Sequence, residues 1–316
     1  MFALHFDGSS ARVKELAEPA PFPDSALVRV SVAGVCDTDL QLVKGYMGFR
    51  GVLGHEFVGT VADGPTELRG RRVVGEINFA CGSCPVCEAG VQRHCPSRRV
   101  LGILDADGAF AEFVRIPVAN LHSVPDTVPD ELAVFAEPLA AAFEILEQVD
   151  VAPDQDCVVL GDGKLGLLVA QVLASAGAQV RAVGKHAAKL AMLERRGIAT
   201  TMLSDWLPEP TSVVVEATGS PAGFACALAA VRPRGTLVLK TTLAESPAVD
   251  LSPLVINEIQ VVGSRCGPFS PALRALENAD VDVSPLISDR VALRDATRAL
   301  ELAAAPGALK ILIDAA

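Results

Sequence analysis

Two different hydrophobic patterns divide the chain near residue 150. Before that point, short stretches alternate apolar and polar residues, as in ALVRVSV at 26–32, and Gly and Pro residues separate the stretches. Alternation at a period of two is typical of strands that bury one face. We therefore predict an antiparallel β domain in this part of the chain.

From Cys157 onward, short apolar runs alternate with helical patterns. The runs are CVVL, QVRAV, SVVVEA, TLVLK and IQVVG, with a weaker one at TTML. Continuous apolar runs are typical of strands that helices cover on both faces of a parallel sheet. The pattern predicts an α/β fold with a doubly wound, six-stranded parallel sheet. After Arg265 the pattern is mixed again, and we predict a helix at 293–305 and a closing strand at 309–313.

Length, charge and composition narrow the class of protein. The chain has 316 residues. Because a single hydrophobic core stops growing at about 250–300 residues, this length is enough for two cores. Its net charge of −11 argues against binding to nucleic acid, whose affinity depends on neutralised phosphates. No run approaches the ~18 apolar residues of a membrane span, and the first residues lack the pattern of a signal peptide. We predict a cytoplasmic protein that binds a small-molecule substrate and neither nucleic acid nor membrane.

One compact loop carries four of the eight cysteines. Their spacing is Cys81-x2-Cys84-x2-Cys87-x7-Cys95, within ACGSCPVCEAGVQRHC. Two-residue spacers let one loop supply several thiolates to a tetrahedral zinc ion, and they make disulfides between the neighbours awkward. We predict a structural zinc site in a lobe at 80–96, with no coordination position left open for chemistry.

A second possible metal set is dispersed along the chain. It comprises Cys36 in GVCDTD, His55 in GHEFVG and Glu137 in AEPLAAA. Each of these residues alone is more often structural. Together, one Cys, one His and one carboxylate form the ligand set of an open catalytic zinc site, whose fourth position holds water or substrate. The set therefore predicts a second zinc ion with a catalytic role.

A glycine motif, Gly161-x-Gly163-x-x-Gly166, lies in VVLGDGKLGLLVAQVL. It follows an apolar strand and opens a helix, and this context identifies a dinucleotide-binding turn. The glycines permit close approach of the pyrophosphate, which binds at the helix N-terminus. The predicted cofactor-binding residues of this turn are Gly161, Asp162, Gly163, Lys164 and Leu165.

The end of the second strand of this domain indicates which cofactor is used. Folds that prefer NAD place an acidic residue there, about 20 residues past the glycine motif. In this chain the position is Gly184, followed by Lys185 and His186, with Lys189 one helical turn further on. A glycine there clears space and removes the acidic side chain, while the cations suit a 2′-phosphate. We predict that the protein binds NADP(H) in preference to NAD(H).

Taken together, these motifs give the chain a family resemblance. On GVCDTDL, GHEFVG, the four-cysteine lobe, EPLAAA, VVLGDGKLG, EATGS and ALKILI, it resembles the zinc-containing medium-chain dehydrogenase/reductase superfamily over nearly its whole length. The resemblance implies a GroES-like β-barrel catalytic domain at 1–137 and 267–316, with a Rossmann domain at 138–266. It also implies two zinc ions per subunit, NAD(P)-linked oxidation of alcohols or polyols, and a homodimer or homotetramer.

The resemblance also assigns roles to single residues. Thr38 matches the hydroxyl that starts a proton relay, and Asp39 matches a carboxylate that hydrogen-bonds the zinc histidine. Glu137 lies at the position where alcohol dehydrogenases have a second zinc-binding cysteine. In having a glutamate there, the chain is similar to the polyol, threonine and glucose dehydrogenase branch. Glu137 and Glu56 both remain candidates for the third ligand. Further cofactor contacts implied by the resemblance are Thr218, Gly219, Arg265 and Lys310.

Two other classes of protein share parts of this pattern. Zinc-free quinone and enoyl reductases have the same architecture but lack the cysteine lobe and the Cys/His pair. A non-catalytic NADP-binding sensor or structural protein has no need of Thr38, Asp39 and both zinc sets together. The sequence therefore favours a zinc-dependent enzyme.

Overall fold

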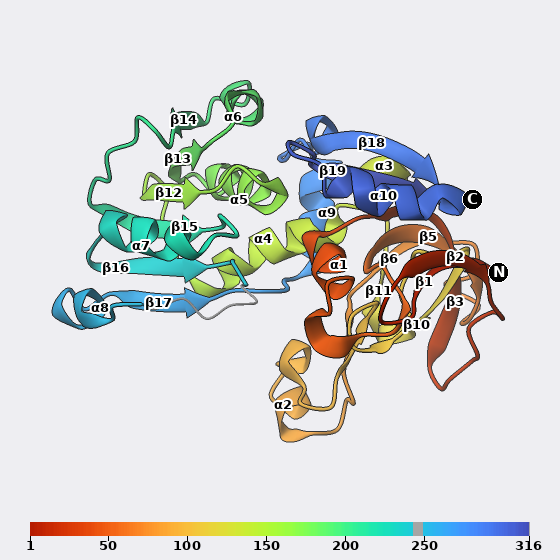
Figure 1. Cartoon of the computed structure of the whole chain (residues 1–316). Helices are drawn as coiled ribbons and strands as arrows, with labels where there is room; N and C mark the ends of the chain where they lie inside the picture. Colours follow the sequence, from red (N-terminus) through yellow and green to blue (C-terminus); the bar gives the residue numbers. More distant parts are fainter. Residues whose placement is uncertain (243–248, 316) are drawn as a thin grey trace. The chain divides into compact units, whose positions relative to one another are not determined.

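The computed structural model describes residues 1–242 and 249–315, and the chain divides into two compact units. The first unit comprises Met1–Glu137 and the residues from Leu286 onward, and the second comprises Pro138–Pro285. Figure 1 labels their helices and strands. Within the described ranges, no helix combines the length and the apolar character that a membrane crossing requires.

The main sheet of the first unit is built from both ends of the chain. Its strand order is β11-β6-β5-β3-β19-β18, and β10 also pairs with β3. The late strand β19 runs antiparallel to β3, with Leu312 opposite Gly34. The strands are β3 (Ser25–Gly34), β5 (Glu56–Asp63), β6 (Arg72–Gly75), β10 (Phe113–Pro117), β11 (Leu121–Ser123), β18 (Ile287–Ala292) and β19 (Lys310–Asp314).

Smaller elements complete the first unit. The predicted C-terminal helix begins as a 3₁₀ turn, η5, and continues as α10, which contacts β18 and β19. The short strands are β1 (Phe2–Phe6), β2 (Ala11–Glu15), β4 (Gly51–Val52), β7 (Asn78–Phe79), β8 (Arg99–Leu101) and β9 (Asp105–Ala106). The helices are α1 (Asp37–Leu42), η1 (Tyr46–Gly48), α2 (Pro85–Glu88), η2 (Gln92–His94), η3 (Val118–Asn120), α3 (Asp130–Ala133), η5 (Leu293–Asp295) and α10 (Ala296–Ala303).

The second unit contains the predicted six-stranded parallel sheet. Its order is β14-β13-β12-β15-β16-β17, and every neighbouring pair is parallel. This order is that of a doubly wound dinucleotide-binding sheet, so the predicted fold is confirmed. The strands are β12 (Asp156–Leu160), β13 (Gln179–Gly184), β14 (Ala199–Met202), β15 (Thr211–Glu216), β16 (Val231–Leu239) and β17 (Gln260–Gly263). The helices are α4 (Ala136–Gln148), α5 (Lys164–Ser175), α6 (Ala187–Glu194), α7 (Pro221–Ala230), α8 (Ser252–Ile256), α9 (Phe269–Glu277) and η4 (Ser284–Leu286).

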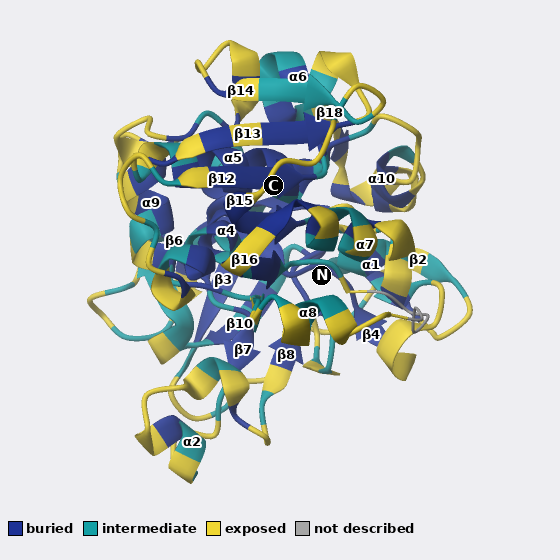
Figure 2. Ribbon diagram, turned by 90° about the vertical axis from the view of Figure 1, so that its left-hand side faces the viewer, coloured by how far each residue is buried: buried dark blue, intermediate teal, exposed yellow. Residues whose placement is uncertain are grey.

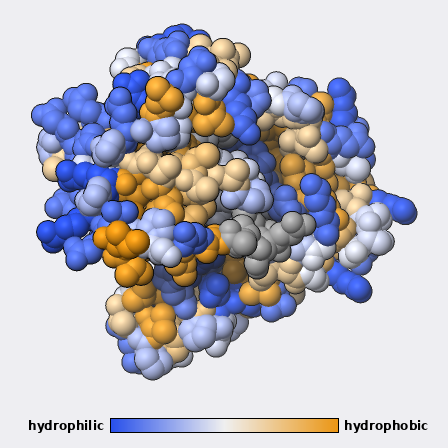
Figure 3. Space-filling view, turned by 60° about the vertical axis from the view of Figure 1, so that its left-hand side comes forward, coloured by the Kyte–Doolittle hydropathy of each residue, from blue (hydrophilic) through white to orange (hydrophobic). Residues whose placement is uncertain are grey.

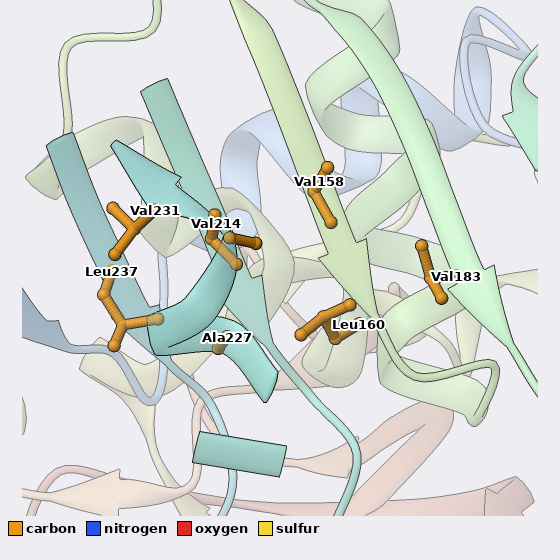
Figure 4. Close-up of a cluster of buried hydrophobic side chains, with 8 residues drawn as sticks. Val158, Leu160, Val183, Val214, Ala227, Val231 and Leu237 are labelled. Carbon is orange, nitrogen blue, oxygen red and sulfur yellow. The ribbon is translucent and has the colours of Figure 1, made fainter. Parts of the chain in front are cut away.

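Apolar side chains from neighbouring strands meet a helix in the core of this sheet. Figure 2 shows β12, β13 and β15 as largely buried ribbons, whereas exposed positions lie in loops, on helices and on parts of β13 and β16. Burial on both faces explains why these strands read as continuous apolar runs. The cluster drawn in Figure 4 includes Val158, Leu160, Val183, Val214, Ala227, Val231 and Leu237.

The second boundary between the units differs from the sequence-based one. We expected the catalytic domain to resume at 267, but residues 267–285 belong to the second unit. The Gln171 side chain of α5 accepts a hydrogen bond from the Asp282 backbone and donates one to it. Gly267 packs against the backbone of Ala140, where a Cβ atom would collide. These contacts hold α9 and its flanking loops to the second unit.

Candidate functional site

The four cysteines of the lobe come together at the spacing that a zinc ion requires. Neighbouring Sγ atoms of the four lie 3.5–4.0 Å apart. A disulfide needs about 2.05 Å, whereas four thiolates at a Zn–S distance of about 2.3 Å stand ~3.8 Å from one another. Hydrogen bonding, first from the Ser83 backbone, lowers the pKa of Cys81 to about 6. The lobe therefore fits a metal and not two disulfides.

The dispersed set also comes together, at the ends of β3 and β5. Potential ligand atoms of Cys36, His55 and Glu56 all lie within 4.8 Å of one another. Cys36 is the N-cap of α1, two residues after the end of β3, and Glu56 begins β5 opposite Gly34. The pairing of two strands thus joins residues that the sequence keeps separate.

Asp39 ties this cluster together from inside α1. Its Oδ2 accepts a hydrogen bond from the Cys36 backbone at 2.9 Å, and its Oδ1 lies 3.3 Å from His55 Nδ1. With Nδ1 facing the carboxylate, Nε2 is the ring nitrogen that remains for a metal. Burial opposes a charge on His55, but Asp39 and Cys36 outweigh it and raise its pKa well above the usual value.

Thr38 lies beside the cysteine of this cluster. The Cys36 thiol donates a hydrogen bond to the Thr38 hydroxyl oxygen, at 3.7 Å between sulfur and oxygen. A hydroxyl group therefore stands next to the candidate metal position, where a proton relay would begin. The relay itself stays a prediction.

The two candidate carboxylates occupy different positions. Glu56 is buried in the cluster, whereas Glu137, in the first turn of α4, is not within the same 4.8 Å set. Glu56 is held by the ammonium group of Lys310, which also donates a hydrogen bond to Val35 O at 3.3 Å. Burial opposes the charge on Lys310, but Glu56 and Cys36 raise its pKa. Lys310 was assigned to the cofactor from sequence, and that assignment stays untested.

The glycine-rich turn of the second unit needs its glycines. Gly161 has a φ of +116°, and a Cβ atom there would collide with Ala217 O. A Cβ atom on Gly166 would collide with the Gly161 carbonyl oxygen. Gly163 is the N-cap of α5, which begins at Lys164 and continues through Leu165. The turn therefore lets the strand and the helix approach closely, as a dinucleotide site requires.

The end of β13 is occupied differently from what the sequence indicated. We expected Gly184 to leave open space without a carboxylate, but the Asp162 side chain fills that space. A Cβ atom on Gly184 would lie 2.5 Å from Asp162 Cβ and 2.7 Å from its Oδ2. Oδ2 accepts hydrogen bonds from the Lys185 and His186 backbones at 2.8 and 2.6 Å, and it lies 2.9 Å from His186 Nδ1. The carboxylate thus comes from the glycine-rich turn and caps the start of α6.

Three of the remaining predicted cofactor residues, Thr218, Gly219 and Arg265, follow strands of the second unit. Thr218 and Gly219 follow β15, and Gly219 has a φ of +64°. Arg265 follows β17, and its carbonyl oxygen accepts a hydrogen bond from Lys240 Nζ at 3.1 Å. Lys189 is partly exposed on α6. Parallel sheets bind ligands at the carboxyl ends of their strands, so these positions are compatible with the prediction.

Sequence reasoning missed two residues that shape these sites. Gly34 admits no side chain, because a Cβ atom there would lie 2.5 Å from Glu56 Oε2 and 3.2 Å from Lys310 Cδ. Glu216 is buried, and its Oε1 accepts hydrogen bonds from the Thr218 backbone and hydroxyl at 2.7 and 2.6 Å. The acidic residue of EATGS was the available signal for Glu216. For Gly34, the sequence offered only a glycine at a strand end.

Comparison with known proteins agrees with this geometry. The alcohol dehydrogenase GroES-like domain family matches residues 22–126, and the zinc-binding dehydrogenase family matches residues 165–279. Alcohol dehydrogenase TADH from Thermus sp. ATN1 is 30% identical, with a TM-score of 0.89 and coverage of 99% of both chains. The chain belongs to the zinc-dependent medium-chain dehydrogenase superfamily. The GroES-like match contains Cys36, His55, Glu56 and the four cysteines of the lobe, whereas Glu137 lies outside it.

Two further relatives are similar to this chain over almost its whole length. D-arabinitol dehydrogenase 1 from Uromyces fabae is 29% identical over 315 residues, which cover 92% of this chain and 90% of that enzyme. A zinc-binding dehydrogenase from Sinorhizobium meliloti 1021, bound to NADP, is 28% identical. Its TM-score is 0.90, and the match covers 99% of this chain and 98% of that one. The resemblance seen in the sequence is therefore confirmed at the level of the superfamily.

Proposed function

We propose that the protein is a zinc-dependent dehydrogenase that transfers a hydride between a nicotinamide cofactor and an alcohol or polyol. The observation that carries this proposal is the close group of Cys36, His55 and Glu56, in which His55 and Glu56 are buried, with Asp39 beside the histidine and Thr38 beside the cysteine. Such a set suits catalytic zinc because a thiolate, an imidazole and a carboxylate leave one coordination position open. The similarity to D-arabinitol dehydrogenase 1 supports a polyol as substrate.

The residues divide the chemical work among them. A zinc ion held by this set supplies a Lewis acid that makes an alcohol more acidic, and the cofactor accepts the hydride. Asp39 orients the His55 ring and fixes its tautomer. Thr38 accepts the proton that the substrate hydroxyl loses and passes it toward solvent. The four-cysteine lobe supplies shape and no chemistry, because four thiolates complete the coordination of its metal.

A panel of alcohols, polyols, amino alcohols and aldehydes, assayed by cofactor absorbance with both NADP(H) and NAD(H), tests this function. We expect zinc-dependent turnover of at least one polyol or secondary alcohol. Removal of zinc with a chelator should abolish that turnover, and added zinc should restore it. Binding of dinucleotide without turnover of any compound would instead indicate a non-catalytic sensor.

We also propose that the cofactor is NADP(H) more than NAD(H). Lys185 and His186 stand at the start of α6, with Lys189 one turn further on. Their charge and hydrogen-bonding capacity suit a 2′-phosphate. The NADP-bound dehydrogenase from Sinorhizobium meliloti supports this choice. The negative charge of the Asp162 carboxylate opposes binding of a 2′-phosphate, but the backbone N–H groups of Lys185 and His186 donate to its Oδ2, and His186 Nδ1 lies 2.9 Å from the same oxygen.

We further propose that the protein assembles as a homodimer or homotetramer through the β17 end of the parallel sheet. Within the described chain, β17 closes the strand order and carries an unpaired edge. Figure 3 shows apolar side chains at the surface of this unit. The exposed ones on and beside α8 and β17 are Leu251, Val255, Ile256 and Val261. An apolar edge of this kind fits a second copy of itself, and a monomer mass in sedimentation would contradict the assignment.

The structural zinc assignment predicts a loss of stability in Cys84→Ser. Three thiolates hold zinc less well than four, and metal binding contributes directly to folding. Loss of a bound metal is one of the few changes that lower the free energy of unfolding by more than about 4 kcal/mol. We therefore expect Tm to fall by roughly 10 °C or more. Zinc content should fall toward one ion per subunit. Cys226→Ala, outside both clusters, is the control and should keep the full zinc content; equal zinc content in Cys84→Ser would contradict the assignment.

A matched pair of amide variants distinguishes the roles of Glu56 and Glu137. Glu56 belongs to the close group and Glu137 does not, so Glu56→Gln should weaken binding of the catalytic zinc more than Glu137→Gln. Changes around a metal typically alter its affinity or the activity by about 10–100-fold. Zinc titration of each holoenzyme variant measures the difference. A larger effect in Glu137→Gln would make Glu137 the working ligand.

A further inference from the structure

Lys310 and Glu56 meet across a single glycine in the main sheet of the first unit. Gly34, at the end of β3, is paired with Glu56 of β5 on one side and with Leu312 of β19 on the other. Lys310 lies two residues before Leu312 on β19. The two side chains cross over Gly34, where a Cβ atom would lie 2.5 Å from Glu56 Oε2. A side chain at position 34 would therefore collide with this ion pair.

The ion pair is closed off from solvent. Both side chains are 1% exposed. Besides Glu56 Oε2, the Lys310 ammonium group contacts Val35 O at 3.3 Å and lies 5.5 Å from the centre of the Phe135 ring. A buried ammonium group is tolerated only with a counter-charge and further hydrogen bonds, and it has both here. Its contacts commit Lys310 to the first unit's own residues.

The two oxygens of Glu56 have different surroundings. Oε2 is held by Lys310, whereas Oε1 is buried with no hydrogen-bond partner among the described residues. The Glu56 carboxylate also lies in the close group with Cys36 and His55. A buried carboxylate oxygen without a partner is unfavourable unless a donor or a cation satisfies it. The carboxylate is therefore divided between the lysine and the candidate metal position.

We infer that Lys310 is a positioning residue that holds back one oxygen of Glu56 and so sets how firmly this carboxylate binds the catalytic metal. The inference rests on the zinc-dependent function proposed above. With Oε2 on the ammonium group, Glu56 has one oxygen and a partly neutralised charge to offer, so it binds weakly and can be exchanged for substrate. Without the ammonium group, both oxygens and the full charge are available to the metal. Lys310 thus acts on the reaction through Glu56 and not on the dinucleotide.

Variants of the holoenzyme test this role by the rate of zinc release into a chelator. Lys310→Met removes the charge and should slow release of the catalytic zinc by about tenfold or more. It should also lower kcat and leave the KM of the dinucleotide unchanged. Lys310→Arg keeps the charge and should release zinc nearly as the wild type does. Release from the four-cysteine lobe is the internal control and should be the same in every variant.

The double variant Lys310→Met/Glu56→Gln keeps the test decisive even where Lys310→Met does not fold. It removes both charges, and it should release zinc at the rate of Glu56→Gln alone, because Lys310 acts only through Glu56. Unequal rates in these two proteins would overturn the inference. So would a raised KM for the dinucleotide with unchanged zinc release in Lys310→Met, which would place Lys310 on the cofactor. Wild-type protein that turns over without zinc would instead contradict the proposed function itself.

Discussion

Replacement of His55 by alanine is expected to lower kcat/KM by about a thousandfold or more while the fold is retained. His55 belongs to the close group with Cys36 and Glu56, and its loss removes one of the ligands proposed for the catalytic zinc. Lewis-acid stabilisation of a transition state contributes several kcal/mol, and each ~1.4 kcal/mol is tenfold in rate. The cluster lies at strand ends, so the backbone pairing of β3 with β5 does not depend on the imidazole. Steady-state kinetics, zinc content and Tm measure the three effects.

A graded variant and a matched control accompany this prediction. Asp39→Asn keeps the shape next to His55 but weakens its orientation, so a loss of about 10–100-fold is expected. His122→Ala is the control, because His122 Nε2 lies 3.0 Å from Glu76 Oε1 in a similar pair outside the metal cluster. It should keep zinc and turnover. Wild-type turnover in His55→Ala, or an equal loss in His122→Ala, would remove His55 from the proposed reaction.

The parts of the site that were predictable from sequence depend on local spacing. The four cysteines lie within one loop, and their mutual distances follow from short spacers and the turns of α2 and η2. The glycine-rich turn was also recognisable, since Gly161 and Gly166 meet steric limits inside one strand–turn–helix unit. Cys36 and His55 were found from their motifs, but their proximity depends on the register of β3 with β5.

The parts that were not predictable depend on contacts between distant residues. Lys310 meets Glu56 only because β19, from the far end of the chain, pairs beside β3. No period or spacing near Gly34 indicates that two charged side chains cross above it. Likewise, the sequence indicated open space at Gly184, because Asp162, which fills that space, lies in the glycine-rich turn after β12. In both cases a glycine was visible in the sequence, and the side chain it accommodates was not.

The second large effect is expected on the preference of the enzyme for NADP(H) over NAD(H). Lys185→Ala should lower kcat/KM for NADP(H) by about ten- to a hundredfold and leave the value for NAD(H) almost unchanged. A hydrogen bond to a charged group contributes about 1.5–3 kcal/mol, and each ~1.4 kcal/mol is tenfold in affinity. The backbone N–H of Lys185 is held by Asp162 at 2.8 Å, so removing the side chain should leave the start of α6 in place. The ratio of the two kcat/KM values separates a lost phosphate contact from general damage, which lowers both.

A reversal of this preference requires two substitutions together. Gly184→Asp alone places a Cβ atom 2.5 Å from Asp162 Cβ, so it should damage the use of both cofactors instead of switching between them. Asp162→Ala does not relieve this contact, because alanine keeps the Cβ atom, whereas Asp162→Gly removes it. We expect the double variant Asp162→Gly/Gly184→Asp to favour NAD(H). The carboxylate introduced at position 184 then stands at the end of β13, where it can accept a hydrogen bond from the ribose 2′-hydroxyl and repel a 2′-phosphate. Asp162→Gly is the control for the flexibility that a third consecutive glycine adds. Wild-type protein that uses NAD(H) as well as NADP(H), or a double variant that still prefers NADP(H), would show that the end of β13 does not select the cofactor.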